Sequence, residues 1–182
     1  MAALVAALLT QATDRSTWLA ARLGTRFDNH AALIVGLALA LGLVNAIAAA
    51  GATLVAPLLS PNARTLLLAL ALVSAGAAAL VRPKPPTETF RGGAFIAALA
   101  GSLALGIGDR TQFITFALAA RTSIPALAAV GATVGGLAVQ IPAMLAGERA
   151  RSRLPEQAIR LPVAILLLVA GAVIGLSALR LL

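Results

Sequence analysis

The chain has 182 residues and no cysteine; 60% of it is hydrophobic, only 11% is charged, and its formal net charge is +8. Soluble domains carry about 25% charged residues, so the composition excludes an ordinary soluble protein and predicts an integral membrane protein. Nucleic-acid binding is excluded because the basic residues lie between apolar runs, and the lack of cysteine excludes disulfides and thiolate metal sites.

The first half of the chain predicts three membrane spans. They cover about residues 2–21, 31–56 and 64–81. The first is expected to be a helix with a polar face. We expect it to be retained and not cleaved as a signal peptide, because no Lys or Arg precedes its apolar core. Arg22 and Arg26 are expected in the loop that follows it.

A proline-rich, charged segment at residues 82–91 predicts a cytoplasmic linker between two halves, residues 1–81 and 92–182. The second half predicts three more spans. The first of them is longer than the roughly 20 residues that cross a bilayer, so a break is predicted near Gly106 and Gly108. The three spans are expected at about residues 92–120, 125–146 and 162–179.

The two halves repeat each other at an offset of 95 residues (109 minus 14). The matches involve scarce residue types, which indicates an internal duplication. Because each half has an odd number of spans, the second half is expected to lie inverted in the membrane. The predicted fold class is therefore an all-α integral membrane protein with six transmembrane helices in two inverted-topology three-helix repeats. The matched pairs include Asp14 with Asp109, Arg15 with Arg110, Ser16 with Thr111, Asn45 with Gln140, Gly36 with Gly131, and Gly76 with Gly171. These glycines are expected at close helix contacts.

The basic residues outside the two Asp-Arg pairs predict the orientation. By the positive-inside rule the face that is richer in them is cytoplasmic, so both termini are expected on the non-cytoplasmic side. The richer face collects Arg22, Arg26, Arg82, Lys84, Arg91, Arg149, Arg151, Arg153 and Arg160. The opposite face collects Arg64, Arg121 and Arg180.

Charged residues inside the apolar runs mark the candidate site. An isolated charge near the bilayer centre costs roughly 2.5–3.5 kcal/mol, so it persists mainly where function requires it. Asp14 and Asp109 are expected to approach each other and to bind a hard divalent cation, or protons when the cation leaves. Arg15 and Arg110 follow them directly and are the expected charge partners. Neutral oxygens are expected from Gln11, Ser16, Asn45, Thr111, Gln112 and Gln140.

Other interpretations of these residues stay open. The Asp-Arg pairs alternatively neutralise each other between helices, and Asn45 and Gln140 alternatively join helices through their amides. The sequence Gly-Ile-Gly-Asp at residues 106–109 also matches the Gly-x-Gly-Asp signature of intramembrane aspartyl proteases, with Asp14 and Asp109 as the dyad. An enzyme is disfavoured, because each aspartate precedes an arginine and the duplication already explains their pairing.

These motifs resemble the transmembrane protein 165 family of small cation/proton antiporters. That family has two inverted three-helix repeats, each with the signature Glu-φ-Gly-Asp-(Lys/Arg)-(Ser/Thr), where φ is apolar. The resemblance implies a secondary transporter that moves manganese or calcium, with manganese export in exchange for protons in bacteria. It also implies a bacterial inner-membrane location and no permanently bound cofactor. The matching segments are residues 14–16, 26–27, 45, 108–112, 119–121, 140–143 and 147–148.

The chain departs from the family signature at three positions. Gln11 and Gly106 stand where the family has its glutamates, and Thr13 stands for the first glycine. A site expected to hold four carboxylates therefore keeps two, which leaves a transporter of another small solute, or a non-transporting member, as the alternative. The expected partners are the lipid bilayer and the transported cation, and a homo-oligomer is left open.

Overall fold

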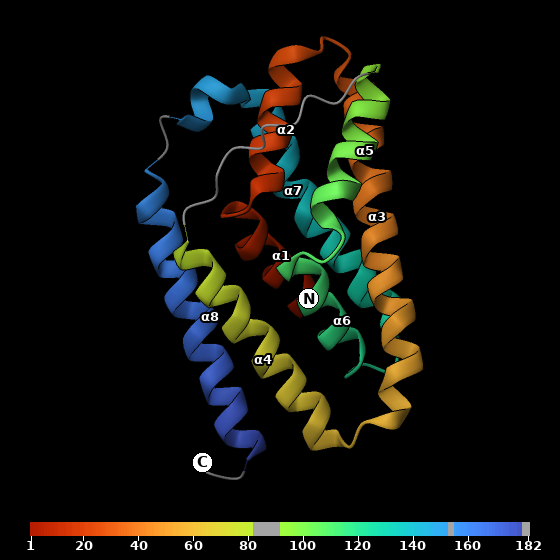
Figure 1. Ribbon diagram of the computed structural model, residues 1–182, viewed down its shortest axis with the longest axis vertical. Coiled ribbons are helices and arrows are strands. Elements are labelled where there is room, and N and C mark those ends of the chain that lie inside the picture. The colour runs from red at the N-terminus through yellow and green to blue at the C-terminus, as the bar shows by residue number, and fades with distance from the viewer. Residues whose placement is uncertain (82–91, 153–154, 180–182) are drawn as a thin grey trace.

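The computed structural model describes residues 1–81, 92–152 and 155–179, and the regular secondary structure within these ranges consists of helices joined by short connections (Figure 1). The predicted linker at residues 82–91 lies outside the described residues. In chain order the helices are α1 (Ala2–Ala12), α2 (Arg15–Arg26), α3 (His30–Val55), the 3-10 helix η1 (Ala56–Leu58), α4 (Pro61–Leu80), α5 (Ala94–Gly106), α6 (Arg110–Ala119), α7 (Pro125–Ser152) and α8 (Glu156–Ala178).

Four helices of the described residues are long and apolar enough to cross a membrane: α3 continued by η1, α4, α7 and α8. Only 28% to 44% of the most apolar stretch of each is buried inside the protein. The outward faces carry large aliphatic side chains, such as Leu39 and Leu43 on α3 and Ile165 and Val169 on α8. Such faces are stable in lipid and not in water. The protein is therefore an integral, multi-pass membrane protein.

The first and fourth predicted spans each consist of two short helices. The predicted break of the fourth is confirmed, since α5 ends at Gly106, α6 begins at Arg110, and Gly108 between them has a φ of +78°. The prediction of one unbroken helix over residues 2–21 is wrong. At Asp14 the backbone is extended and the carboxylate accepts a hydrogen bond from the Ser16 amide, so Asp14 caps a new helix.

Two predicted loops are partly helical. Arg22 and Arg26 lie within α2, because the buried face of this helix continues to Leu23. The other correction concerns α8, which begins at Glu156 and contains Pro162 instead of starting at it. Arg160, one helical turn into α8, donates hydrogen bonds to the Ala79 and Leu80 carbonyls at the end of α4. These bonds hold the first turns of α8 against α4 and extend the helix beyond its apolar stretch.

The helices pack in pairs that follow the offset of 95 residues. α1 packs against α7 and α5 packs against α3; likewise α2 packs against α7 and α6 against α3. α3 also contacts α7, and α4 contacts α8 along one side of the molecule (Figure 1). Each helix of the first half has a counterpart about 95 residues later, and these are α5 for α1, α6 for α2, α7 for α3 and α8 for α4. If every helix is exchanged for its counterpart, the pairs of neighbours named above stay the same.

The predicted close contacts at glycines are confirmed. A Cβ atom on Gly36 of α3 would lie 2.7 Å from the Phe95 carbonyl oxygen of α5, and one on Gly131 of α7 would lie 3.3 Å from the Leu4 amide of α1. In the α4–α8 contact, a Cβ on Gly76 would lie 3.0 Å from the Ala164 carbonyl oxygen. Glycine thus lets the helix backbones approach each other directly.

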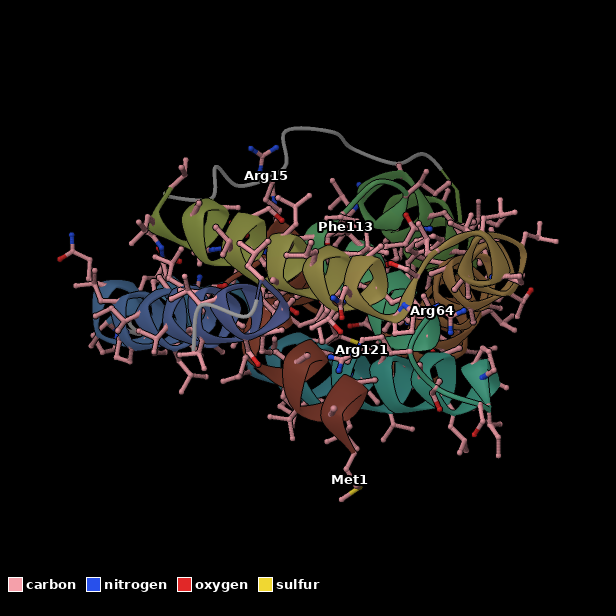
Figure 2. All side chains as sticks on the ribbon, turned by 90° about the horizontal axis from the view of Figure 1, so that it is seen from below. Met1, Arg15, Arg64, Phe113 and Arg121 are labelled. Carbon is pink, nitrogen blue, oxygen red and sulfur yellow. The ribbon has the colours of Figure 1, made fainter. Side chains whose placement is uncertain are left out.

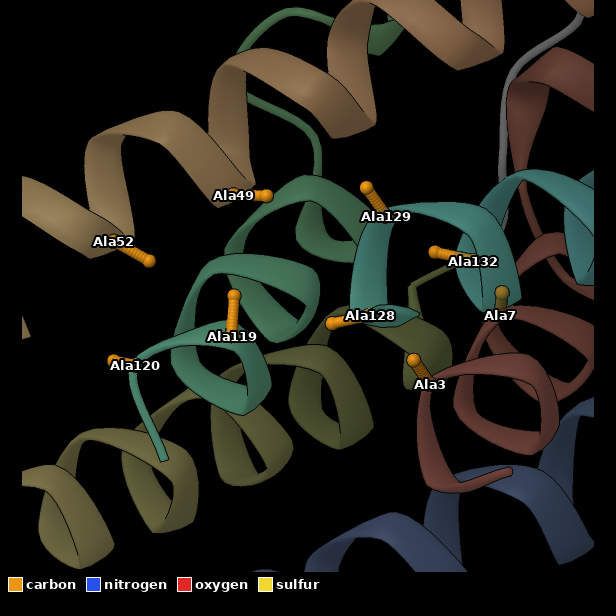
Figure 3. Close-up of a cluster of buried hydrophobic side chains, with 9 residues drawn as sticks. All are labelled: Ala3, Ala7, Ala49, Ala52, Ala119, Ala120, Ala128, Ala129 and Ala132. Atoms are coloured by element: carbon orange, nitrogen blue, oxygen red, sulfur yellow. The ribbon is translucent and has the colours of Figure 1, made fainter. Parts of the chain in front are cut away.

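Alanine also allows close helix packing, where one end of each of the four helices α1, α3, α6 and α7 meets the others. Figure 3 shows buried alanines of α1, α3 and α7 meeting those at the end of α6. Small side chains allow α6 to fit between α3 and α7. Away from this cluster, Thr111 in the first turn of α6 lies 3.0 Å from Thr10 near the end of α1, measured between the two hydroxyl oxygens. The cluster consists of Ala3, Ala7, Ala49, Ala52, Ala119, Ala120, Ala128, Ala129 and Ala132.

Candidate functional site

Asp14 and Asp109 occupy equivalent places, each at the N-cap of the second helix of a broken pair. The Asp14 Oδ2 atom accepts hydrogen bonds from the Ser16 amide at 3.1 Å and from Ser16 Oγ at 2.7 Å. The Asp109 Oδ2 atom accepts one from the Thr111 amide at 3.1 Å. A helix N-terminus carries partial positive charge, so both positions favour an anionic side chain.

Both aspartates line one cavity of about 590 Å³. It lies where the two helix breaks meet the C-terminal half of α4. The structure thus brings together two carboxylates that are far apart in sequence. The full lining is Thr13, Asp14, Arg15, Ser74, Ala78, Val81, Gly108, Asp109, Arg110 and Phe113.

The Asp14 carboxylate forms an ion pair with Arg110 of the opposite half. The Arg110 Nη2 atom lies 3.3 Å from Asp14 Oδ1, and the two side chains are only 10% and 13% exposed. The same nitrogen donates to the Thr10 carbonyl at 3.2 Å and to Thr13 Oγ1 at 3.1 Å. Arg110 is therefore a charge partner of the site, and it acts across the interface between the halves and not on its neighbour in sequence.

The equivalent pair in the other direction is not formed. Arg15 is exposed and Figure 2 shows it pointing away from the helices. Within the described ranges no ion pair involves Arg15 or Asp109, although both line the cavity. The two halves therefore differ at the positions where their sequences agree best.

Gln11 and Gln140 belong to a buried polar network beside the cavity. The Gln11 Oε1 atom accepts hydrogen bonds from Ser16 Oγ at 2.6 Å and from Gln140 Nε2 at 2.8 Å. Its Nε2 atom donates to Thr111 Oγ1 at 3.3 Å. Gln11 and Gln140 are 3% and 0% exposed, so their amides face each other and not the cavity.

The remaining predicted oxygen donors also make bonds between segments. Asn45 donates to Thr133 Oγ1 at 3.2 Å and accepts from Thr115 Oγ1 at 3.2 Å, which joins α3 to α7 and α6. Gln112 accepts from the Gly108 amide at 2.7 Å and donates to the Val44 carbonyl at 3.3 Å. None of the six residues predicted to supply neutral oxygen ligands lines the cavity.

The structure adds oxygen atoms that the sequence did not single out. Thr13 and Ser74 line the cavity with the two aspartates. Thr13 directly precedes Asp14 in the sequence, and this position could have identified it as a site residue. Ser74 lies in the middle of the apolar α4, and nothing in its local sequence indicates that α4 passes the helix breaks.

A second arginine reaches the first helix break. Arg151 is 9% exposed and donates to the Ala12 carbonyl at 2.9 Å, at the carboxyl end of α1. Its guanidinium lies 5.7 Å from the centre of the Trp18 ring, and the Trp18 indole donates to Glu156 at 2.9 Å. The guanidinium groups of Arg110 and Arg151 stabilise the negative end of the α1 dipole. Arg151 therefore helps to hold the helix break, although its sequence position suggested only a cytoplasmic loop.

The charges around the cavity are balanced. Two carboxylates and two guanidinium groups line it, and the described residues contain no group of three or more His, Cys, Asp or Glu side chains placed to hold a metal ion. Thr13 and Ser74 add hydroxyl oxygens. Carboxylate and hydroxyl oxygens suit a hard cation, and the arginines lower the net negative charge that such a cation would meet.

Comparison with known families gives one result that covers both halves. The family model described as divalent cation/proton antiporter GDT1 matches residues 1–86 and again residues 94–181. Neither the curated proteins nor the solved structures yield a match. The two matches coincide with the two halves deduced from the repeated motifs, and members of this family are transporters and not enzymes. The chain belongs to the divalent cation/proton antiporter GDT1 family, as its resemblance to the transmembrane protein 165 family predicted.

Proposed function

We propose that the protein exports a divalent cation, manganese or calcium, in exchange for protons. The observation that carries this proposal is the cavity lined by Asp14 and Asp109, each held at a helix break and supplied by a different half. Two carboxylates provide the charge and oxygen atoms that a hard cation needs when it leaves water. The same groups accept protons when the cation departs, which couples the two fluxes. Family membership supports the reaction class.

The architecture proposed for this transport is six spans in two inverted repeats. α1 with α2 forms the first span and α5 with α6 forms the fourth. Counterpart helices start at a nearly constant offset, and their pairs of neighbours are exchanged between the halves. Broken helices at a repeat interface near the bilayer midplane are the usual place for a substrate site in such transporters. A bacterial inner-membrane location, with both termini on the non-cytoplasmic side, is part of this proposal.

The proposal is tested by transport in proteoliposomes. Manganese, calcium, magnesium and zinc fluxes are measured with the purified protein, with and without an imposed pH gradient. We expect manganese or calcium flux that is accelerated by an opposing proton gradient. Absence of flux for all four cations, with folded protein, would favour the alternative of another small solute or a non-transporting member. The replacement of both family glutamates by Gln11 and Gly106 is the observation behind that alternative.

Two substitutions test the role of the carboxylates. Asp14→Asn and Asp109→Asn are each expected to abolish transport, because asparagine keeps the shape but removes the charge that offsets cation desolvation. The matched control is Asp28→Asn, the same change at an exposed position between α2 and α3. Thermal unfolding in detergent confirms that each variant is folded. Wild-type transport in both cavity variants would show that the aspartates are only structural.

A further inference from the structure

The two aspartates that line the cavity differ in how many of their carboxylate oxygens already have partners. Both Asp14 oxygens are engaged, Oδ1 by Arg110 and Oδ2 by the Ser16 amide and hydroxyl. Asp109 accepts a hydrogen bond only on Oδ2, from the Thr111 amide, among the described residues. A cation that enters the cavity therefore finds one carboxylate open and the other already neutralised.

The group that neutralises Asp14 sits in an oxygen-lined site. The Arg110 Nη2 atom has three oxygen neighbours, Asp14 Oδ1 at 3.3 Å, the Thr10 carbonyl at 3.2 Å and Thr13 Oγ1 at 3.1 Å. A carboxylate, a main-chain carbonyl and a hydroxyl are also the ligand types that hard divalent cations select. The nitrogen thus lies where a cation bound to these three oxygens would lie.

Arg110 is not held as a fully bonded structural arginine would be. Among the described residues, its three hydrogen bonds all come from Nη2, and its buried Nε atom has no hydrogen-bond partner. An arginine has five N–H donors, so most of its bonding capacity is unused. The side chain also lines the cavity, which gives it space to withdraw. It follows Asp109 directly, so a cation on that carboxylate would repel the neighbouring guanidinium.

We propose that Asp14 Oδ1, the Thr10 carbonyl and Thr13 Oγ1 form a second cation subsite, and that the Arg110 guanidinium fills it as a tethered counter-ion until the transported cation displaces it. The inference rests on the proposed cation transport and goes beyond it by naming the ligands and the competitor. Asp109 receives the cation first. Withdrawal of Arg110 then frees Asp14, and α6 is released from the end of α1.

The chain supplies a matched control for this idea. Arg15 occupies the equivalent place in the first half and lines the same cavity, but it is exposed and forms no ion pair within the described residues. Arg110→Gln and Arg15→Gln therefore remove the same charge near the same cavity. Only the first removes the competitor from Asp14.

The experiment is titration of purified protein with manganese, and separately with calcium, by calorimetry. Arg110→Gln is expected to tighten binding at least about fivefold, the lower end of typical coupling between sites. Arg15→Gln removes the same charge from the cavity lining without freeing Asp14, so any gain in affinity is expected to be clearly smaller than that of Arg110→Gln. Asp14→Asn should abolish the gain in the Arg110→Gln background. In the wild-type background the same change should weaken binding by a smaller factor, because there the cation gains Asp14 only by displacing Arg110.

A second variant covers the case in which Arg110→Gln fails to fold. Thr13→Val keeps the side-chain shape and leaves the Asp14–Arg110 pair in place, but it removes one oxygen of the subsite. It is expected to slow manganese transport several-fold without changing the first binding event at Asp109. Unchanged transport in this variant would overturn the assignment of the subsite.

The outcomes separate this inference from the proposed function. Unchanged or weaker binding in folded Arg110→Gln would show that the ion pair is a fixed link between helices, and the tethered counter-ion would be wrong while transport stands. If wild type and Arg15→Gln bind and transport neither cation, the proposed function itself fails.

Discussion

Gln11 and Gly106 stand at equivalent positions of the two halves but have different surroundings. The Gln11 amide bonds to Ser16, Thr111 and Gln140 in a buried network. A Cβ atom on Gly106 would lie 3.1 Å from Val44 Cγ2, so this position has little space for a larger side chain. The signature glutamate of the family is thus replaced in one half by an amide that forms hydrogen bonds, and in the other half by a glycine at a close helix contact.

Restoring an acid at position 11 is therefore the gentler change. Gln11→Glu keeps the oxygen that accepts from Ser16 and Gln140, and it adds charge beside a residue that bonds to Asp14. We expect tighter manganese binding than in wild type and stronger pH dependence, because the added carboxylate must lose its proton before it favours a cation. Manganese titration at several pH values measures both effects.

Gly106→Glu is the companion variant and is expected to lower the yield of folded protein, because the added side chain meets Val44. Equal or weaker manganese binding in folded Gln11→Glu would show that charge at position 11 does not reach the cation.

At the scale of elements, the α4–α8 contact depends on close backbone approach. A Cβ atom on Gly171 would lie 2.9 Å from the Ala69 carbonyl oxygen, whereas one on Gly42 of α3 would meet no atom of the described residues within 4 Å. Backbone atoms cannot move aside as a flexible side chain can, so an added methyl must push the helices apart.

Gly171→Ala is expected to destabilise the protein by about 1–3 kcal/mol, the usual cost of overpacking. Gly42→Ala is the matched control and should be neutral or stabilising by up to about 1 kcal/mol, since alanine favours a helix more than glycine does. Thermal unfolding in detergent compares the two. Similar melting temperatures for both variants would mean that α4 and α8 separate without loss of stability.

The arrangement of the whole molecule predicts on which side of the membrane each connection between helices lies. The α2–α3 connection lies at one end of the molecule and the α3–α4 connection at the other (Figure 1). In the proposed inverted repeat, the connection between α6 and α7 belongs to the same membrane face as that between α3 and α4. The native chain has no cysteine, so single cysteines can be introduced without background labelling.

Labelling of single cysteines with a membrane-impermeant thiol reagent tests this topology. Asp28→Cys is expected to react only from the cytoplasmic side, whereas Asn62→Cys and Ser123→Cys should react only from the opposite side. All three positions are exposed, so reactivity reports the side and not burial. Labelling of Asn62→Cys and Ser123→Cys from different sides would contradict the inverted arrangement.

The sequence by itself determined the membrane environment, the division into two similar halves and the helix break near Gly106 and Gly108, and it singled out the two aspartates that line the cavity. Each of these leaves a local mark: an apolar run, a repeated motif, a glycine, or a charge where charge is costly. The family followed from the same local marks and was confirmed by the two matches of the family model.

Only the tertiary structure decided which arginine meets an aspartate. Asp14-Arg15 and Asp109-Arg110 are identical pairs, yet Arg110 crosses to Asp14 and Arg15 does not reach Asp109. The choice depends on the rotation of each short helix about its axis and on the approach of segments nearly 100 residues apart. For the same reason Gln11 turned out to bond to Gln140 and not to line the cavity. Residue types and spacing do not encode these rotations, because they arise only when the helices pack.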